Sequence, residues 1–178
     1  MIESIKSRSL RHLLQHYLDA RGDKRMPSRR DLDPARLGPV LPIIWLSEYE
    51  AAADTFRYRL AGEEVNEVFG GSVAGRLLSD FVTGDRFQAT NENFLKVLRD
   101  EAALLTSGPI YRCTDRIAMG ERLVLPLSSD GVAADGLLGA TARSALVDLD
   151  VISMDEQKTI YVSIDELVPL DSGRMAGG

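Results

Sequence analysis

Two histidines are the residues of this 178-residue chain whose type and spacing could hold a metal ion. His12 and His16 are four positions apart, so one face of a helix would present both imidazoles to the same ion. Protein-bound zinc takes three or four side-chain ligands, and no third ligand follows these histidines at a recognisable spacing. We therefore predict no metal site and interpret the pair as exposed histidines on a helix.

The residues needed for hydrolytic catalysis are equally scarce. The chain has no Gly-x-Ser-x-Gly elbow, and a Ser-His-Asp triad could recruit only the two N-terminal histidines. Residues 70–75 lack the glycine spacing and the Lys-Ser/Thr pair of a phosphate-binding loop. Neighbouring carboxylates such as Glu63 and Glu64 do not face one another on a helix. We predict no catalytic residues and expect a protein that is not an enzyme.

The charge and the cysteine content limit the partners and the compartment. The chain has 21 Lys and Arg, 27 Asp and Glu and a net charge of −6, which does not favour nucleic-acid binding. Its single cysteine, Cys113, excludes an internal disulfide and is typical of a reducing compartment. No apolar run approaches the roughly 20 residues of a membrane span, and the N-terminus has no apolar secretory region. We expect a cytoplasmic protein that binds neither nucleic acid nor a membrane.

The first half of the chain divides into a helix and a hairpin. Residues 3–20 have apolar side chains at spacings of three and four, which predicts an amphipathic helix that ends at Gly22. Residues 43–50 are rich in β-branched and aromatic side chains, and residues 55–60 alternate strictly between apolar and polar types. A short linker joins them, which predicts an antiparallel hairpin. A short helix is expected after Gly62.

The second half predicts a long helix followed by three strands. The helix is expected over residues 84–106, ended by Gly108 and Pro109. The strands are expected at residues 110–119, 122–128 and 137–145, separated by turn-like residues. Residues 160–164 alternate as in a strand, whereas residues 163–166 match a helix capping box, and both alternatives stay open.

The order of these elements and three local sequences resemble one family. Residues 29–42 read RRDLDPARLGPVLP, residues 56–62 read FRYRLAG, and Leu125-Pro126-Leu127 follows on a later strand. The order of two strands, then helices, then three strands is similar to the PAS fold. The local sequences resemble small bacterial PAS-like proteins over about residues 20–145.

The resemblance implies an α+β fold in which a five-stranded antiparallel sheet carries helices on one face, with the N-terminal amphipathic helix added. It implies three parts, namely the helix at 1–22, a PAS-like domain at 23–145 and a C-terminal extension at 146–178 with a disordered end. PAS domains commonly dimerise through an N-terminal helix that lies on the outer face of the sheet. The resemblance therefore implies a homodimer and would place Trp45 or Ile43 on that outer face.

PAS domains bind a small molecule or a cofactor between the sheet and the helices, or they act as dimerisation modules in signalling. The resemblance therefore implies a sensor or signalling adaptor without catalytic activity, in which a bound ligand would reposition the N-terminal helix. Two alternatives stay open. One is an enzyme that acts on a small substrate in the same pocket, and the other is a purely structural dimerisation module.

The candidate site is an interior pocket lined by apolar and aromatic side chains of the predicted strands and helices. The residues expected to line it are Phe56, Tyr58, Leu60, Val65, Phe69, Phe94, Leu98, Tyr111, Leu125, Leu127 and Leu138. The same residues could form a solid core, because cavities in protein interiors are few. Tyr58 and Tyr111 are the most informative, since a buried phenol needs a hydrogen-bond partner that a ligand could supply. A charged pocket for an organic acid is a further alternative. Four arginines should lie on the opposite sheet face and pair with acids or attract an anionic partner, namely Arg57, Arg59, Arg112 and Arg116.

The resemblance also bears on cofactors, of which none is predicted. Haem-binding PAS domains usually ligate iron through a histidine in the helical segment before the third strand, and residues 63–119 contain none. Tyr111, Cys113 or Met119 could substitute. Light-sensing flavin domains need a reactive cysteine in an Asn-Cys-Arg-Phe context on the helical side, whereas Cys113 lies on a predicted strand. Haem and flavin are therefore not favoured.

Overall fold

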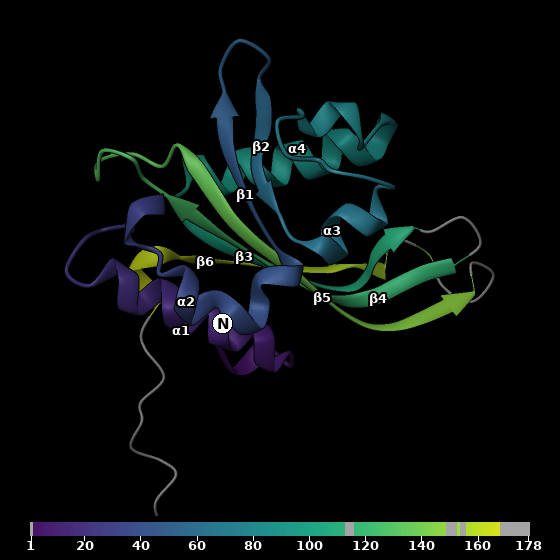
Figure 1. Cartoon of the computed structure of the whole chain (residues 1–178), viewed down its shortest axis with the longest axis horizontal. Coiled ribbons are helices and arrows are strands. Elements are labelled where there is room, and N and C mark those ends of the chain that lie inside the picture. The colour runs from purple at the N-terminus through teal and green to yellow at the C-terminus, as the bar shows by residue number, and fades with distance from the viewer. Residues whose placement is uncertain (1, 113–115, 149–152, 154–155, 168–178) are drawn as a thin grey trace, which may run out of the picture.

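The computed structural model describes residues 2–112, 116–148, 153 and 156–167, which form a six-stranded antiparallel sheet with helices on both faces (Figure 1). The strand order is β2-β1-β5-β4-β3-β6. The strands are β1 (Ile44–Glu50), β2 (Thr55–Ala61), β3 (Ala102–Arg112), β4 (Arg116–Leu127), β5 (Gly136–Asp148) and β6 (Lys158–Ser163). The helices are α1 (Arg8–Arg21), α2 (Pro34–Leu37), α3 (Glu63–Val68) and α4 (Gly84–Arg99), with short 3-10 turns η1 (Ile2–Ser4), η2 (Arg29–Asp31), η3 (Gly38–Ile43), η4 (Leu78–Asp80) and η6 (Ile164–Glu166). The predicted α+β class is confirmed, and within the described ranges no helix is long and apolar enough to cross a membrane.

The sheet has one strand more than the expected five, because part of the C-terminal extension joins its edge. β6 pairs with β3, with Val162 opposite Ala103. The chain then enters η6 at Ser163, whose hydroxyl accepts a hydrogen bond from the backbone N–H of Asp165 at 3.3 Å. A strand and a helical cap therefore both occur in this segment, one after the other. The end of the extension, where we expect disorder, lies outside the described residues.

The long helix α4 ends at Arg99, so the prediction that it continues to residue 106 is wrong. Glu101 adopts a left-handed backbone conformation, with φ of 44°, and β3 begins directly after it. Leu104 packs on one face of the sheet and Leu105 on the other. The segment is apolar at consecutive positions because it is buried on both faces, and such a run does not distinguish a strand from a helix by periodicity.

The predicted turn at Gly120 is also wrong, because this residue lies inside β4. Gly108 and Gly120 are opposite one another in the β3–β4 ladder, and a β-bulge follows between Pro109 and Tyr111. The connection between β3 and β4, which includes Cys113, lies outside the described residues.

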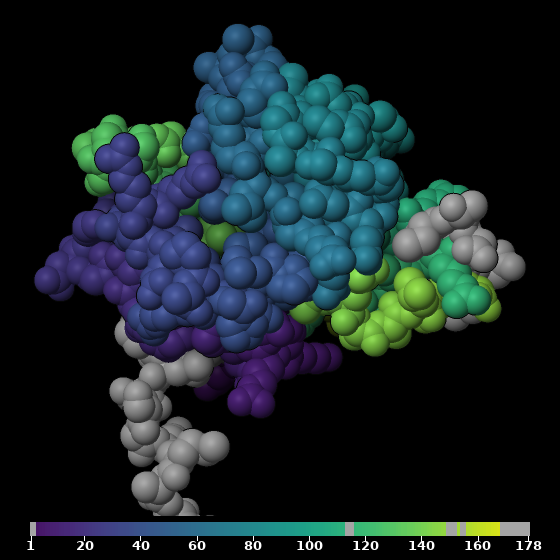
Figure 2. Space-filling view, viewed as in Figure 1, coloured from purple at the N-terminus to yellow at the C-terminus, as the bar shows by residue number. Residues whose placement is uncertain are grey.

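Helix α1 buries its apolar side against the outer face of its own sheet. We call this contact the outer core; its main members are Leu10, Leu13, Leu14, Tyr17 and Leu18 of α1 and Leu105, Leu123, Leu125, Leu127 and Leu138 of the sheet. The Tyr17 hydroxyl donates a hydrogen bond to the carbonyl of Pro126 at 2.8 Å. This buried hydroxyl therefore has a hydrogen-bond partner within the interface. Figure 2 shows the purple and blue segments around α1 and α2 in the lower part of the view, away from the teal helix α4.

A buried carboxylate of β4 fixes the start of α1. Glu121 is 7% exposed and accepts hydrogen bonds from the backbone N–H of Lys6 at 3.0 and 3.1 Å and of Ser7 at 2.7 Å. Ser7 is the N-cap residue and accepts a hydrogen bond from the Leu10 N–H. The position of α1 is therefore connected directly to the position of β4.

Helices α3 and α4 cover the opposite face of the sheet. We call this contact the inner core; its buried members include Trp45, Phe56, Tyr58, Val65, Phe94, Leu104, Val124 and Leu137. Ile43, Ile44 and Leu46 belong to the outer core, whereas Trp45 points to the inner side, as strand alternation requires. The prediction that Trp45 lies under the N-terminal helix is therefore wrong, and the prediction for Ile43 is confirmed.

Of the two histidines expected to be exposed, His16 is 2% exposed. Its Nε2 accepts a hydrogen bond from the backbone N–H of Asp33 at 3.1 Å, and its Nδ1 has no partner among the described residues. Burial, and then the positive charge of Arg36, lower the pKa of His16 below its usual 6.5. The folded protein therefore holds His16 as a neutral imidazole at pH values at which the unfolded chain already protonates it.

We expect the free energy of unfolding to fall as the pH is lowered through about 6.5, by at most about 1.4 kcal/mol per pH unit. The loss begins near the unfolded pKa of 6.5 and stops below the folded pKa, where both states are protonated. Urea unfolding at several pH values measures it. His16→Gln keeps an acceptor for the Asp33 N–H and should lose most of this slope, whereas His12→Gln should keep it. An equal slope in His16→Gln would contradict the assignment.

Candidate ligand-binding cavity

A cavity of about 380 Å³ lies between the inner face of the sheet and the helices α3 and α4. Its apolar wall consists of Trp45, Val65, Phe69, Leu78, Val82, Ala89, Phe94, Leu104 and Ile110. Its polar wall consists of Tyr58, Asp85, Arg86, Thr90, Asn93, Thr106, Tyr111, Arg122 and Gln157. The volume is within the range of roughly 300–1,000 Å³ that is typical of small-molecule sites.

Ring contacts hold the aromatic wall of the cavity in place. The Trp45 ring centroid lies 5.2 Å from that of Tyr58 and 5.1 Å from that of Phe94. Phe69 stands edge-on to Tyr111, with their ring centroids 5.8 Å apart. Such tilted and edge-on contacts are favourable for aromatic pairs, so the rings form a defined surface for a ligand to contact.

Trp45 can take this position only because a glycine lies beneath it. A β-carbon placed on Gly139 of β5 would lie 2.1 Å from Cζ2 and 2.2 Å from Cε2 of the indole. Trp45 and Gly139 are direct neighbours in the β1–β5 ladder, so the ring lies flat over the glycine backbone. The missing side chain at Gly139 thus makes room for one wall of the cavity.

Two polar side chains of this wall are buried and have no hydrogen-bond partner in the described part of the chain. Tyr58 and Thr106 are each 5% exposed, and no other atom of the described residues bonds to the hydroxyl of either. Burial raises the pKa of Tyr58 well above its usual 10, although the positive charge of Arg122 opposes this shift. Tyr58 is therefore a neutral hydroxyl that can donate a hydrogen bond to a bound molecule.

The sequence matches one known protein family. The family model of the PAS domain matches residues 5–142. The chain belongs to the PAS domain family. A search of curated proteins found no match. The matched range includes α1 and most of β5, so in this PAS domain the strand β6 lies beyond the matched residues.

The structure brings five of the eleven predicted pocket residues to the PAS cavity. They are Tyr58, Val65, Phe69, Phe94 and Tyr111. Phe56 and Leu98 belong to the same inner core but do not line the cavity. Leu60, Leu125, Leu127 and Leu138 lie on the opposite face of the sheet, in the outer core, so their placement in the pocket is wrong.

Two physical causes explain the four misplaced leucines. In β2, Leu60 is opposite Leu46 and Tyr58 is opposite Ser47, so Arg59 is the extra residue of a β-bulge. The bulge reverses the alternation and turns Leu60 away from Tyr58. In β4 and β5 the leucines at 125, 127 and 138 lie on the face that α1 covers, and the PAS resemblance alone does not specify which face of a strand looks inward.

Several cavity residues were absent from the sequence prediction, above all Trp45, Thr106 and Arg122. Strand alternation could have placed Arg122 on the inner face of the sheet. Leu123 and Leu125 face the outer core, so Arg122 lies on the same face as Val124, which belongs to the inner core. The polar residues of α4 could not be assigned to the cavity from the sequence, because a polar helix face usually contacts only solvent.

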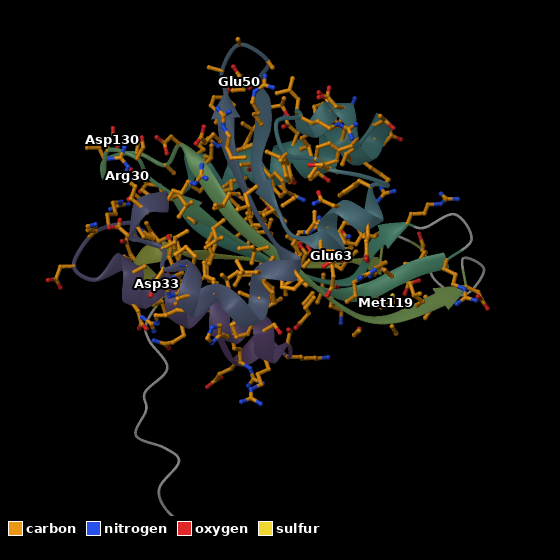
Figure 3. The ribbon with its side chains drawn as sticks, in the orientation of Figure 1. Arg30, Asp33, Glu50, Glu63, Met119 and Asp130 are labelled. Atoms are coloured by element: carbon orange, nitrogen blue, oxygen red, sulfur yellow. The ribbon has the colours of Figure 1, made fainter. Side chains whose placement is uncertain are left out.

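The residues considered for cofactors have different positions in this PAS domain. Tyr111 lines the cavity, whereas Met119 lies on β4 outside it, where that strand extends beyond α3 (Figure 3). Both histidines are on α1, on the other side of the sheet, and Cys113 lies outside the described residues. The cofactor expectations stay predictions.

The arginines of β2 pair with acids, which is one of the two roles expected of them. Arg57 Nε lies 2.7 Å from a carboxylate oxygen of Glu50, and Arg59 Nε lies 2.7 Å from one of Glu48. These pairs are partly exposed, so each contributes little to the stability.

Proposed function

We propose that this PAS domain is a non-catalytic cytoplasmic sensor or signalling adaptor that binds one small organic molecule in the cavity. The observation that carries the proposal is a 380 Å³ cavity lined by Tyr58, a mostly buried tyrosine whose hydroxyl bonds to no other described residue. A ligand that accepts a hydrogen bond from this hydroxyl gains a contact that contributes about 0.5–1.5 kcal/mol.

The position of β4 supports a route from the cavity to α1. Arg122 lines the cavity on one face of this strand, and its neighbour Glu121 holds the start of α1 on the other face. A ligand that prefers one position of β4 would therefore shift the population of α1 positions as well. This is the proposed mechanism of signalling.

Homodimerisation through the N-terminal helix remains part of the proposal. The apolar side of α1 is buried on its own sheet, so a partner copy would contact the exposed side, which carries Arg8, Arg11 and Asp19. Light scattering of the full chain tests this contact, and a second-copy contact through charged residues should weaken as the salt concentration rises.

A cavity-filling variant tests ligand binding. Thr90→Phe places a ring in the cavity from α4, whereas Gln88→Phe adds the same ring on the exposed surface of the same helix. In a thermal-shift screen of small organic molecules, we expect compounds that stabilise the wild type and Gln88→Phe but not Thr90→Phe. A bound ligand at 100 times its Kd adds about 2.7 kcal/mol to the stability, which is easily measured.

Two outcomes would count against the proposal. Compounds that stabilise Thr90→Phe as much as the wild type would bind elsewhere. A screen in which nothing stabilises the wild type would favour the structural module, and turnover of a stabilising compound would favour the enzyme.

A further inference from the structure

Arg122 is the cationic side chain that the sheet contributes to the cavity, and its strand has a paired neighbour on each side. It lies opposite Thr106 of β3 and opposite Thr141 of β5. Its Nε donates a hydrogen bond to the Thr141 hydroxyl at 3.1 Å, and its guanidinium carbon lies 4.9 Å from the centre of the Tyr111 ring. The hydrogen bond at Nε and the face of the Tyr111 ring therefore both orient the guanidinium group.

No carboxylate of the described residues lies within 4.0 Å of the Arg122 guanidinium. Arg57, Arg59 and Arg143 all have such a partner. Arg122 is half-buried, and a guanidinium removed from water needs an anion or several acceptors to offset its desolvation. The N–H groups of its two Nη atoms have no acceptor in the described part of the chain.

The other polar groups near Arg122 also offer hydrogen-bond donors. Tyr58 is close enough for the charge of Arg122 to act on its phenol, and Thr106 is its cross-strand neighbour. Trp45, Phe94 and Ile110 are among the apolar residues of the wall. The cavity therefore combines the Arg122 guanidinium and two hydroxyls with a mostly apolar surface.

We propose that the ligand is a small monocarboxylic acid with an apolar or aromatic body, whose carboxylate binds the Nη atoms of Arg122. This proposal rests on the proposed function and specifies its ligand class. A planar guanidinium binds a carboxylate through two parallel hydrogen bonds, and the Tyr58 hydroxyl can donate a third. The other charged residues of the lining, Asp85 and Arg86, have opposite charges, so the lining has a net charge of one positive unit from Arg122, which suits one carboxylate.

Acids and their uncharged amides test the proposal in calorimetric or NMR titrations at neutral pH. The probes are 3-phenylpropionate with 3-phenylpropionamide, and hexanoate with hexanamide. We expect each acid to bind the wild type at least about tenfold more tightly than its amide, because only the acid pairs with Arg122. Arg122→Gln should weaken acid binding by about 30-fold or more and leave amide binding nearly unchanged.

Arg116→Gln is the matched control, because Arg116 lies on the same strand with an exposed side chain. It should bind the acids as the wild type does. If Arg122→Gln does not fold, Arg122→Lys keeps the charge but loses the bidentate geometry, and the comparison of acids with amides on the wild type needs no variant.

The outcomes separate this proposal from the proposed function. Amides that bind the wild type as tightly as the acids would overturn the assignment of a carboxylate ligand. The proposal that the cavity binds a small molecule would be unaffected. Failure of both acids to bind at millimolar concentration would also overturn it. The screen with Thr90→Phe would then decide separately whether the cavity binds any small molecule.

Discussion

A chain that lacks residues 1–22 should not fold. The deletion removes α1 and exposes the outer face of the sheet, on which five apolar side chains of this helix are fully or almost fully buried. Burial of such side chains contributes on the order of 10 kcal/mol, which is as large as the whole stability of a typical domain. Circular dichroism and the solubility of the truncated chain measure the effect.

The deletion also distinguishes packing within one chain from a helix that only joins two copies. A purely dimerising helix would leave a folded, soluble monomer after the deletion, and that result would contradict the outer core described above. A milder variant gives a graded measure. Leu14→Ala should lower the free energy of unfolding by about 2–5 kcal/mol, whereas Arg8→Ala on the exposed side should change it by less than about 0.5 kcal/mol.

Gly139→Ala should destabilise the protein by about 3 kcal/mol and distort the cavity. The new methyl group would overlap the Trp45 indole, which contacts the rings of Tyr58 and Phe94 and would have to shift toward the cavity. Overpacking of this kind typically costs 1–3 kcal/mol, and a clash with a rigid ring lies at the upper end. Urea unfolding gives the change in stability, and Trp45 is the only tryptophan, so its fluorescence reports its surroundings directly.

Gly38→Ala is the control for this substitution. Gly38 has an ordinary right-handed helical conformation, and a β-carbon there would meet no atom within 4 Å. We expect a change below about 0.5 kcal/mol and an unaltered emission spectrum. A wild-type spectrum and stability for Gly139→Ala would show that the indole does not lie over the glycine.

Much of the fold could be predicted from local patterns. The spacing of apolar residues in α1, the alternation in the β1–β2 hairpin and the PAS-like local sequences each identify an element or the family correctly. Asp33 caps α2 through a hydrogen bond from the Ala35 N–H at 2.9 Å, and an aspartate directly before a proline is typical of a helix start. These features depend on neighbours in the sequence.

The predictions that are wrong concern features that depend on contacts between segments distant in the sequence. β3 begins at Ala102 because β4 and β6 pair with it on both sides, and no local pattern reports those partners. The face of Leu60 depends on a bulge at Arg59, and the faces of Leu125 and Leu127 depend on where α1 docks. Five of the predicted pocket residues therefore line the cavity, whereas four lie on the other face of the sheet.

Arg122 lines the cavity, but a prediction of an apolar pocket does not include such a charged residue. A prediction based on aromatic and aliphatic positions selects the body of a binding site, but it omits the polar group that decides which ligand binds. The distinguishing observation is an absent carboxylate, and only coordinates show which acids of the described chain are near a given arginine.

Native mass spectrometry tests the central claim, that the cavity binds a small molecule, most directly. The full chain is dialysed against the small-molecule fraction of a cell extract and measured beside Thr90→Phe and Gln88→Phe. We predict one small-molecule adduct per chain in the wild type and in Gln88→Phe, and the bare chain of 19.5 kDa in Thr90→Phe. The bare mass in all three proteins, or the same adduct in all three, would contradict ligand binding in this cavity.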